Sequence, residues 1–575
     1  MEIIRKKKRD HAHPYIPELE SLYRQGRITR REFLRNATLL GMSLGAASLI
    51  ASCAPDEPDE PVVVATDTPE PVPTDTPVPV GPQRGGVMTQ GQQVRGIDHP
   101  ARYSWITGDA NITRFMIEHL GVTDKDNITH PHLLESWEAS DDLLTWTLNL
   151  RQNVTWSTGE PFIADDVIFT IEEWLDVDVG SSMLGLMGDY LTADNVERVD
   201  DHTVRLHLDS PQIAVPEHLY HYAAPVVDHR TFEGDWLENP VGTGPFVLEE
   251  WTVGERAVLK ARDGYWLMGE DGEPLPYLDE LRFIDLGEEE TAYISAILGG
   301  EIDTFYPLEA PSIVALRDEA DIELPGIATG DTRVLRMRVD REPFTDNRVR
   351  TAIKMCLDRQ KILDLAYFGE GVTGGDYHVA PVTPAHSDAV EPLPFDREQA
   401  RAILADAGFP DGLDVELTVG SGWLDAVSFG ETLREDAEPA GIRIAIRSVP
   451  TSVYWDEWTE VDFGITPWAH RPLAVMTLPL GYICDRDGNP VPWNETRWCD
   501  EEFTELLLKA QGTLDVEQRR EIMHDIQVIQ RDRGSIGIPY WRNRWIAYRK
   551  EIKGLLPHPT AYNDIFVHAW RDPLA

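Results

Sequence analysis

Three neighbouring side chains late in the chain carry the chemistry needed to hold a small anionic solute. Trp468 offers a large, rigid apolar face. Arg471 carries a planar guanidinium whose paired N–H groups suit a carboxylate or a phosphate. His470 adds a donor whose charge can change near neutral pH. The same residues also fit a plainer interpretation, in which Trp468 is a core residue and Arg471 pairs with a surface carboxylate.

Patterns typical of catalysis are missing from the sequence. It contains no H-E-x-x-H or Walker sequence, and its one G-x-S-x-G match, at 41–45, falls within the uncharged run Asn36–Ser52. Carboxylate pairs such as Asp165-Asp166 and Glu172-Glu173 recur throughout this acidic chain, and we interpret them as helix caps and solvated surface. We therefore predict a protein that is not an enzyme and has no cofactor; a secreted lipoprotein hydrolase is the weaker alternative.

The histidines show no spacing that is typical of a metal site. His130 and His132 flank a proline in an expected loop and are a weak candidate pair. His207 falls on the polar face of an expected strand and His524 on an expected helix, so both are interpreted as surface or hydrogen-bonded residues. The sequence therefore predicts no metal site.

Length and charge limit the classes of function. The 575 residues suggest two to four domains, and 42% hydrophobic with 26% charged residues is typical of a soluble globular protein. The formal net charge of −47 repels phosphate backbones, which argues against nucleic acid as a partner. Neither wholesale disorder nor a polytopic membrane protein fits this composition.

The amino terminus resembles an export and lipidation signal. Thr29–Arg35 is similar to the twin-arginine motif, the uncharged run Asn36–Ser52 suits a signal-peptide core, and Ile50–Cys53 looks like a bacterial lipobox. The resemblance implies that residues 1–53 are a signal peptide with a lipobox and that Cys53 is lipidated. We expect an exported protein, lipid-anchored on the outer face of the cytoplasmic membrane or in the periplasm.

Residues 54–85 read as a linker rich in proline, threonine and acidic residues, with repeats at Thr66–Pro69 and Thr74–Pro77. Such a segment has too little apolar surface to fold and stays extended.

Strands and helices alternate in the rest of the chain. Period-two patterns predict strands over 144–151, 203–208 and 442–447. Helical patterns follow Asp346 and Asp396, each a suitable cap, and a third helix is predicted over 516–533. An α/β or α+β protein of several lobes follows.

An ordered series of short motifs runs along residues 86–560. In chain order they are PHLLESWE at 131–138, LTWTLNLR at 144–151, GEPFIADDV at 159–167, PVGTGPF at 240–246, YLDEL at 277–281, GEID at 300–303, PFTDNRVR at 343–350, ADAGFPDG at 405–412 and NETRWC at 494–499. The series resembles the signature of family 5 extracellular solute-binding proteins, the oligopeptide-, dipeptide- and nickel-type receptors of ABC importers.

The resemblance implies a two-lobed α/β fold of the periplasmic-binding-protein kind, type II with the extra subdomain of the oligopeptide-binding group. It places lobe 1 at 86–335 plus 534–575 and lobe 2 at 336–533. The chain would cross twice, near 333–336 and near 534–540, and this two-strand hinge would let the lobes close on a ligand.

The implied function is a membrane-tethered receptor that binds a peptide or related small solute and delivers it to a permease and ATPase. Trp468 matches the tryptophan that lines the family's cleft. Trp105 falls in the loop after the first mature strand, where relatives touch ligand, and Tyr454, with Trp455 beside it, is a weaker candidate. All five predicted ligand contacts are Trp105, Tyr454, Trp468, His470 and Arg471.

Two departures from the family pattern leave the solute open. His470 and Arg471 replace the acidic stretch that holds a peptide amine in many relatives, and Arg338 replaces the usual asparagine at the start of lobe 2. Both add positive or titratable groups. An opine-like anion and an oligosaccharide stacked on Trp468 are therefore alternatives to a peptide.

The four cysteines have separate expected roles. Cys53 belongs to the signal, and Cys356 falls on the apolar face of a helix as a buried, free thiol. Cys484 and Cys499 are 15 residues apart in lobe 2, where some dipeptide-type relatives carry a cysteine pair. In an oxidising compartment we expect them to form a disulfide.

Overall fold

The computed structural model describes residues 81–105, 107–485, 488–560 and 564–573. The chain divides into two compact units, Met1–Val78 and Pro79–Ala575, and the fold below is that of the second. The predicted signal peptide, Cys53 and nearly all of the predicted linker lie outside the described residues. None of the helices in the described ranges combines the length and the hydrophobicity of a membrane-spanning segment.

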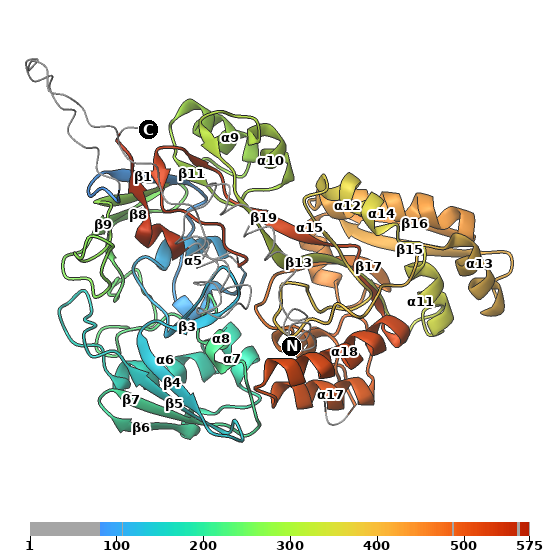
Figure 1. The fold of residues 1–575 in the computed structure, drawn as a ribbon, viewed down its shortest axis with the longest axis horizontal. Coiled ribbons are helices and arrows are strands. Elements are labelled where there is room, and N and C mark those ends of the chain that lie inside the picture. Colours follow the sequence, from blue (N-terminus) through green and yellow to red (C-terminus); the bar gives the residue numbers. More distant parts are fainter. Residues whose placement is uncertain (1–80, 106, 486–487, 561–563, 574–575) are drawn as a thin grey trace, which may run out of the picture. The chain divides into compact units, whose positions relative to one another are not determined.

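Two seven-stranded sheets form the framework of the second unit (Figure 1). In the first sheet β1 pairs in parallel with β10 and β11, and the other pairs are antiparallel. Its strands in spatial order are β12 (Ile322–Glu323), β20 (Tyr548–Arg549), β11 (Thr304–Phe305), β1 (Val87–Gly91), β10 (Glu280–Ile284), β9 (Arg256–Ala261) and β8 (Phe246–Thr252).

The second sheet contains the strands that position the candidate site. Strand β15 pairs in parallel with both β16 and β17, whereas β13 pairs antiparallel with β17, β18 and β19. Its strands are β14 (Gly371–Thr373), β19 (Tyr540–Trp545), β13 (Gly326–Met337), β17 (Phe463–Trp468), β15 (Leu413–Gly420) and β16 (Ile442–Val449), with β18 (Ile536–Gly537) beside β13.

The remaining strands form three smaller sheets. A four-stranded antiparallel sheet has the order β4 (Leu134–Ala139), β5 (Thr145–Leu150), β7 (Thr203–His207) and β6 (Val196–Asp200). Two antiparallel two-stranded sheets are formed by β2 (Gly121–Thr123) with β3 (Thr129–Pro131) and by β21 (Ile552–Lys553) with β22 (Trp570–Arg571). The predicted strands at 144–151, 203–208 and 442–447 are confirmed as β5, β7 and β16.

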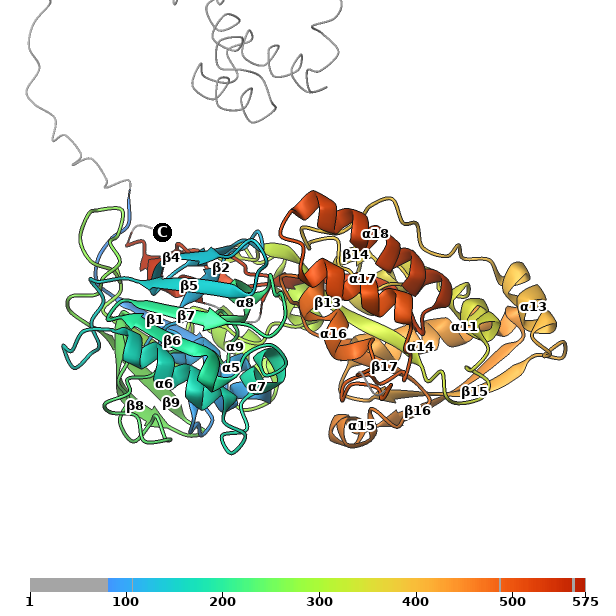
Figure 2. The ribbon, with the colours of Figure 1, turned by 90° about the horizontal axis from the view of Figure 1, so that it is seen from below.

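The helices cover these sheets. In chain order the α-helices are α5 (Thr107–Thr113), α6 (Ala164–Leu175), α7 (Ser182–Met187), α8 (Val215–His218), α9 (Glu290–Gly299), α10 (Ala310–Leu316), α11 (Asn347–Lys354), α12 (Arg359–Tyr367), α13 (Arg397–Asp406), α14 (Leu424–Ala437), α15 (Thr451–Glu457), α16 (Leu478–Gly481), α17 (Glu501–Gln511) and α18 (Val516–Arg533). Short 3₁₀ helices lie at Pro100–Trp105, Ala193–Asn195, Glu438–Ala440, Ala474–Met476 and Asp564–His568. Figure 2 shows α17 and α18 side by side, as their contacts require.

The three predicted helices are confirmed, with their caps. Asp346 accepts a hydrogen bond from Arg348 N at the start of α11, and Asp396 accepts from two backbone N–H groups of α13. One detail of the prediction is wrong: α11 ends at Lys354, so Cys356 follows the helix rather than lying on it. Its thiol is nonetheless buried in the core beneath the second sheet.

Strand pairing shows where the chain passes between the two large sheets. It leaves the first sheet after β12 and enters the second at Gly326, and it returns between Trp545 and Tyr548. The crossings expected at 333–336 and 534–540 therefore fall within strands β13, β18 and β19 of the second sheet. The sequence pattern marks these strands as extended but does not reveal which sheet they join.

Candidate functional site

The carboxyl ends of three parallel strands meet at one edge of the second sheet. Strand β15 leads into Trp423, β16 leads into α15 with Tyr454, and β17 ends at Trp468 with Arg471 just beyond. Such an edge is where open α/β sheets commonly bind ligands, because the loops that follow adjacent parallel strands converge there. Four of the five predicted contact residues lie at this edge: Tyr454, Trp468, His470 and Arg471.

A buried polar network fixes the Trp468 indole. Its Nε1 donates to Glu495 Oε1 at 3.0 Å, and the other carboxylate oxygen lies 3.2 Å from Arg336 Nε. Thr466 Oγ1 donates to the same carboxylate at 2.5 Å, so the hydroxyl of Tyr454, 2.8 Å from Thr466 Oγ1, is the donor in that pair. Tyr454 is fully buried and thus supports Trp468 from behind rather than presenting itself to a solute.

Arg471 lies beside two indoles and close to residues of other segments. Its Cζ is 6.0 Å from the Trp468 ring centre and 5.9 Å from that of Trp493. Burial, with the positive charge of Arg471 as the second cause, lowers the pKa of His218 and of His378 to about 3. Both imidazoles are therefore neutral at pH 7, and the guanidinium is the positive group among them.

His470 has a different role from the predicted one. Its Nδ1 accepts from Gly330 N at 2.8 Å, so the ring proton sits on Nε2, which donates to Asn127 Oδ1 at 2.9 Å. The amide of Asn127 donates in turn to Val382 O at 3.1 Å. Because both ring nitrogens have protein partners, His470 holds the β2–β3 turn to the second-sheet side instead of offering a donor to solute.

We predict that His470 makes the protein acid-sensitive. Burial lowers the pKa of His470 in the folded protein to about 3, whereas an exposed histidine in the unfolded chain titrates near 6.5. The contribution of the neutral imidazole to folding stability is therefore complete above pH 6.5 and is lost as the pH falls toward 3. At about 1.4 kcal/mol per pH unit, this residue alone accounts for about 3 kcal/mol between pH 6.5 and 4. In urea denaturation at pH 6.5 and at pH 4, the unfolding free energy of His470→Gln should fall by about that much less than that of wild type. Equal losses in the two proteins would contradict the buried neutral imidazole.

The other predicted positive group is neutralised. The guanidinium of Arg338 donates to both carboxylate oxygens of Asp340 and, at 2.8 Å, to Glu460. The hydrogen bond to Asp340 is the main cause that raises the pKa of Arg338. Its backbone N–H donates to Asp462 just before β17 begins, so Arg338 lies at the opposite end of that strand from Trp468 and Arg471.

Trp105 is the last residue of a 3₁₀ helix rather than part of an open loop. Its side chain lies outside the described part of the structure, so the expected contact with solute stays a prediction.

Sequence reasoning missed several residues that build this edge. Glu495 was visible only as part of the motif at 494–499, and Asn127 only as part of an Asn-Ile-Thr sequence. Trp493, Trp458 and His378 carried no signal beyond their residue types. All five act through contacts with residues distant in the chain.

A disulfide closes the segment that carries Trp493 and Glu495. Cys484 and Cys499 are paired, with Cα atoms 5.5 Å apart, and Asn494 Nδ2 donates to the carbonyls of Ile483 and Trp498. The disulfide and these hydrogen bonds hold the segment so that Trp493 and Glu495 contact Trp468.

We predict that unfolded, unreduced mature protein exposes one reactive thiol, that of Cys356. In the folded state burial raises the pKa of this thiol to about 12, so it should react only after unfolding. Mass spectrometry after alkylation should find the label on Cys356 and none on Cys484 or Cys499. Alkylation of Cys484 would show that the Cys484–Cys499 disulfide is absent from the mature protein.

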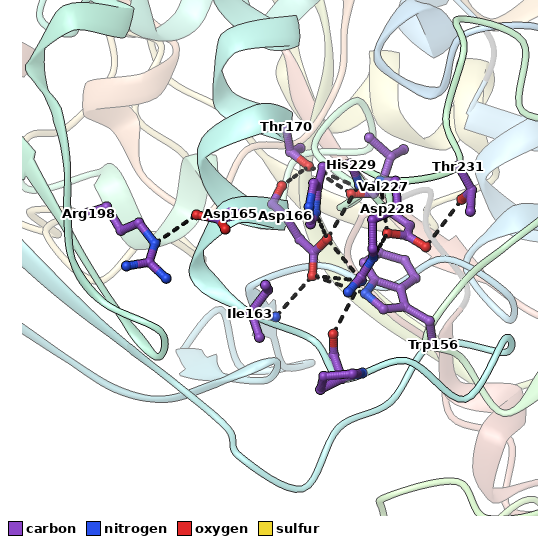
Figure 3. Close-up of polar contacts among 12 residues, drawn as sticks. Trp156, Ile163, Asp165, Asp166, Thr170, Arg198, Val227, Asp228, His229 and Thr231 are labelled. Carbon is purple, nitrogen blue, oxygen red and sulfur yellow. Dashed lines mark hydrogen bonds and ion pairs between the residues drawn. The ribbon is translucent and has the colours of Figure 1, made fainter.

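One cluster of potential metal ligands lies far from this edge in the described residues, formed by Asp166, Asp228 and His229 (Figure 3). Asp166 already accepts from Trp156 Nε1, Ile163 N and His229 Nδ1, at 3.0, 2.9 and 2.5 Å. The Arg230 guanidinium lies 3.2 Å from one Asp166 oxygen and 2.6 Å from Asp228. The cluster therefore caps α6, as the sequence suggested for Asp165-Asp166, and its carboxylates already have a cation.

His130 and His132, the weak candidate pair, are each hydrogen-bonded to a carboxylate. Their Nε2 atoms lie 2.8 Å from Asp124 Oδ2 and from Glu118 Oε1, respectively. The two rings therefore contact different carboxylates and do not converge on a common metal position.

Two cavities lie away from the candidate edge. One, of about 780 Å³, is an open depression along the four-stranded sheet near Glu135 and His202. The other, of about 460 Å³, is lined by Glu118, His119 and Tyr220 among others. Neither includes Trp468 or Arg471.

Comparison with known proteins identifies the family that this chain resembles. The family model described as "Bacterial extracellular solute-binding proteins, family 5 Middle" matches residues 129–477. The dipeptide-binding protein of Escherichia coli (strain K12) is 27% identical over 472 residues, covering 75% of this chain and 84% of that protein. The heme-binding protein A of Haemophilus influenzae is 24% identical over 473 residues, covering 76% and 83%.

Solved structures show the same fold. AgaA of A. tumefaciens R10, in complex with agropinic acid, superposes with a TM-score of 0.69 at 22% identity, covering 84% of this chain and 99% of that one. The substrate-binding protein CtaP of Listeria monocytogenes gives 0.75 at 21% identity, covering 85% and 100%. These likenesses confirm the predicted fold class.

Proposed function

This chain belongs to the bacterial extracellular solute-binding proteins of family 5, and we propose that it is the solute receptor of an ABC import system. It binds a small acidic solute, a peptide or an opine-like molecule, at the carboxyl edge of the second sheet. Closure about the β13 and β19 passages then traps the solute, and the closed form delivers it to the permease and ATPase.

The observation that carries this proposal is the position of Arg471. The guanidinium beside Trp468 favours an anion, because it carries a permanent positive charge and paired N–H donors. The nearby imidazoles of His218 and His378 are kept neutral by burial, so Arg471 supplies the positive charge at this position. The indole of Trp468, held by Glu495, supplies an apolar face next to that charge. A dipeptide and agropinic acid, named for two of the relatives, are both small molecules with an acid group.

The experiment asks for binding without turnover, which separates a receptor from a hydrolase. The solute that copurifies is released by denaturation, identified by mass spectrometry and added back to solute-free protein. We expect saturable one-to-one binding and recovery of the solute unchanged after prolonged incubation. Conversion of the solute would favour the hydrolase, and a solute without an acid group would overturn the proposed class.

We also propose that the protein is exported by the twin-arginine route and anchored through Cys53. The support is the order of Arg30-Arg31 and the lipobox in the sequence. Replacing Arg30 and Arg31 by Lys should retain precursor in the cytoplasm, as cell fractionation would show, and Cys53→Ala should abolish lipid labelling. Normal export of the double Lys variant would exclude this route.

A further inference from the structure

We propose that an aromatic subsite extends the candidate site beyond Arg471 and takes an aromatic ring of the acidic solute. It consists of four indoles, here called the tryptophan row: Trp423, Trp455, Trp458 and Trp493. The inference rests on the proposed function and adds the substrate class, an acid that carries an aromatic group.

The tryptophan row is continuous. Successive ring centres lie 6.2 Å apart from Trp468 to Trp493, 6.3 Å to Trp458, 5.6 Å to Trp455 and 5.3 Å to Trp423, each pair edge to face. These separations are those of favourable aromatic pairs. A further ring placed on the row would make contacts of the same kind.

Three separate segments build the row. Trp423 follows β15, Trp455 and Trp458 lie on and just after α15, and Trp493 comes from the segment closed by the disulfide. The main-chain carbonyl of Trp458 accepts from Arg336, the cation that pairs with Glu495. The row is thus tied to the network that orients Trp468, and it is not a stripe along a single helix.

Burial changes along the row. Trp468 is only 5% exposed, whereas Trp493 and Trp455 are 40% and 39% exposed. Large indoles with this much surface in solvent mark a binding surface more often than a core. The row therefore leads from the buried anchor at Trp468 to an open apolar surface.

Exposed aliphatic side chains extend the apolar surface of the row. Leu424, next to Trp423, is 69% exposed, and Val453, two residues before Trp455, is 38% exposed. Arg471, 5.9 Å from the Trp493 ring, places the positive charge at one end of the row.

The test uses two acids that differ only in one side chain, N-acetyl-alanyl-tryptophan and N-acetyl-alanyl-alanine, titrated calorimetrically into solute-free mature protein. We expect the tryptophan probe to bind about tenfold more tightly, as one or two aromatic contacts would provide. Trp493→Ala and Trp455→Ala should each reduce the ratio of the two affinities to below about threefold. Leu365→Ala, which removes an exposed apolar side chain on α12, should leave the ratio unchanged.

The outcomes separate this inference from the proposed function. Equal binding of both probes in wild type, with both weakened by Arg471→Ala, would overturn the aromatic subsite and leave the acid receptor standing. Failure of both probes to bind would overturn the aromatic-acid class. Binding of maltotriose that is lost in Trp493→Ala would replace it by a sugar. If the tryptophan variants still bound the probes but no longer supported import, the tryptophan row would be a surface that contacts another protein of the import system.

Discussion

Replacing Arg471 by alanine should weaken binding of the copurified solute by about 2–4 kcal/mol, or roughly 30- to 1,000-fold. The substitution removes the positive group beside Trp468 and leaves the anion of the solute without its charged partner. Arg471→Lys should recover only part of the loss, because an ammonium restores the charge but not the paired N–H geometry. Isothermal titration of the three proteins with the same solute measures the effect.

The control is Arg447→Ala, which removes another arginine of the second sheet, on β16, where its guanidinium pairs with Glu457. It should bind solute as wild type does. A neutral oligosaccharide would give the opposite pattern, with loss on Trp468→Ala and little change on Arg471→Ala. If neither Trp468→Ala nor Arg471→Ala changed the affinity by threefold, the site would be misplaced.

Arg336→Met should lower the free energy of unfolding by about 3–5 kcal/mol. The side chain of Arg336 is fully buried and pairs with Glu495, and its guanidinium also donates to the carbonyls of Val461 and Trp458. Methionine fills a similar volume but leaves the Glu495 carboxylate buried without a cation. Urea denaturation at pH 7 gives the difference.

The double variant Arg336→Met with Glu495→Leu separates the effect of the ion pair on folding stability from its effect on solute affinity. Removing both charges should restore much of the stability, since an apolar pair can replace a buried ion pair at little cost. It should not restore affinity, because Trp468 Nε1 then lacks its acceptor and the indole loses its fixed orientation. A single variant that loses less than about 1 kcal/mol would contradict a central role for the pair.

The elements of this fold are local features, and the sequence predicts them well. Alternating residues of β16 and the capped helices α11, α13 and α18 follow from patterns within a few residues. The pairing of Trp468 with Arg471 is local too, because three residues separate them just after a strand.

The remaining parts of the site depend on distant contacts. Glu495 reaches Trp468 across 27 residues, and Asn127 reaches His470 across 343. A single sequence does not show that His470 is buried with both nitrogens engaged, so its residue type suggested a titrating ligand. Likewise the pairing of Arg338 with Asp340 and Glu460 depends on how β13 ends, which periodicity does not specify.

A crystal structure of the protein with its copurified solute would show directly where the solute binds. We expect the anionic group of the solute within hydrogen-bond distance of the Arg471 guanidinium and an apolar face of the solute against Trp468. Density for the solute in the cavity beside His119, with Arg471 turned away from it, would exclude the proposed site.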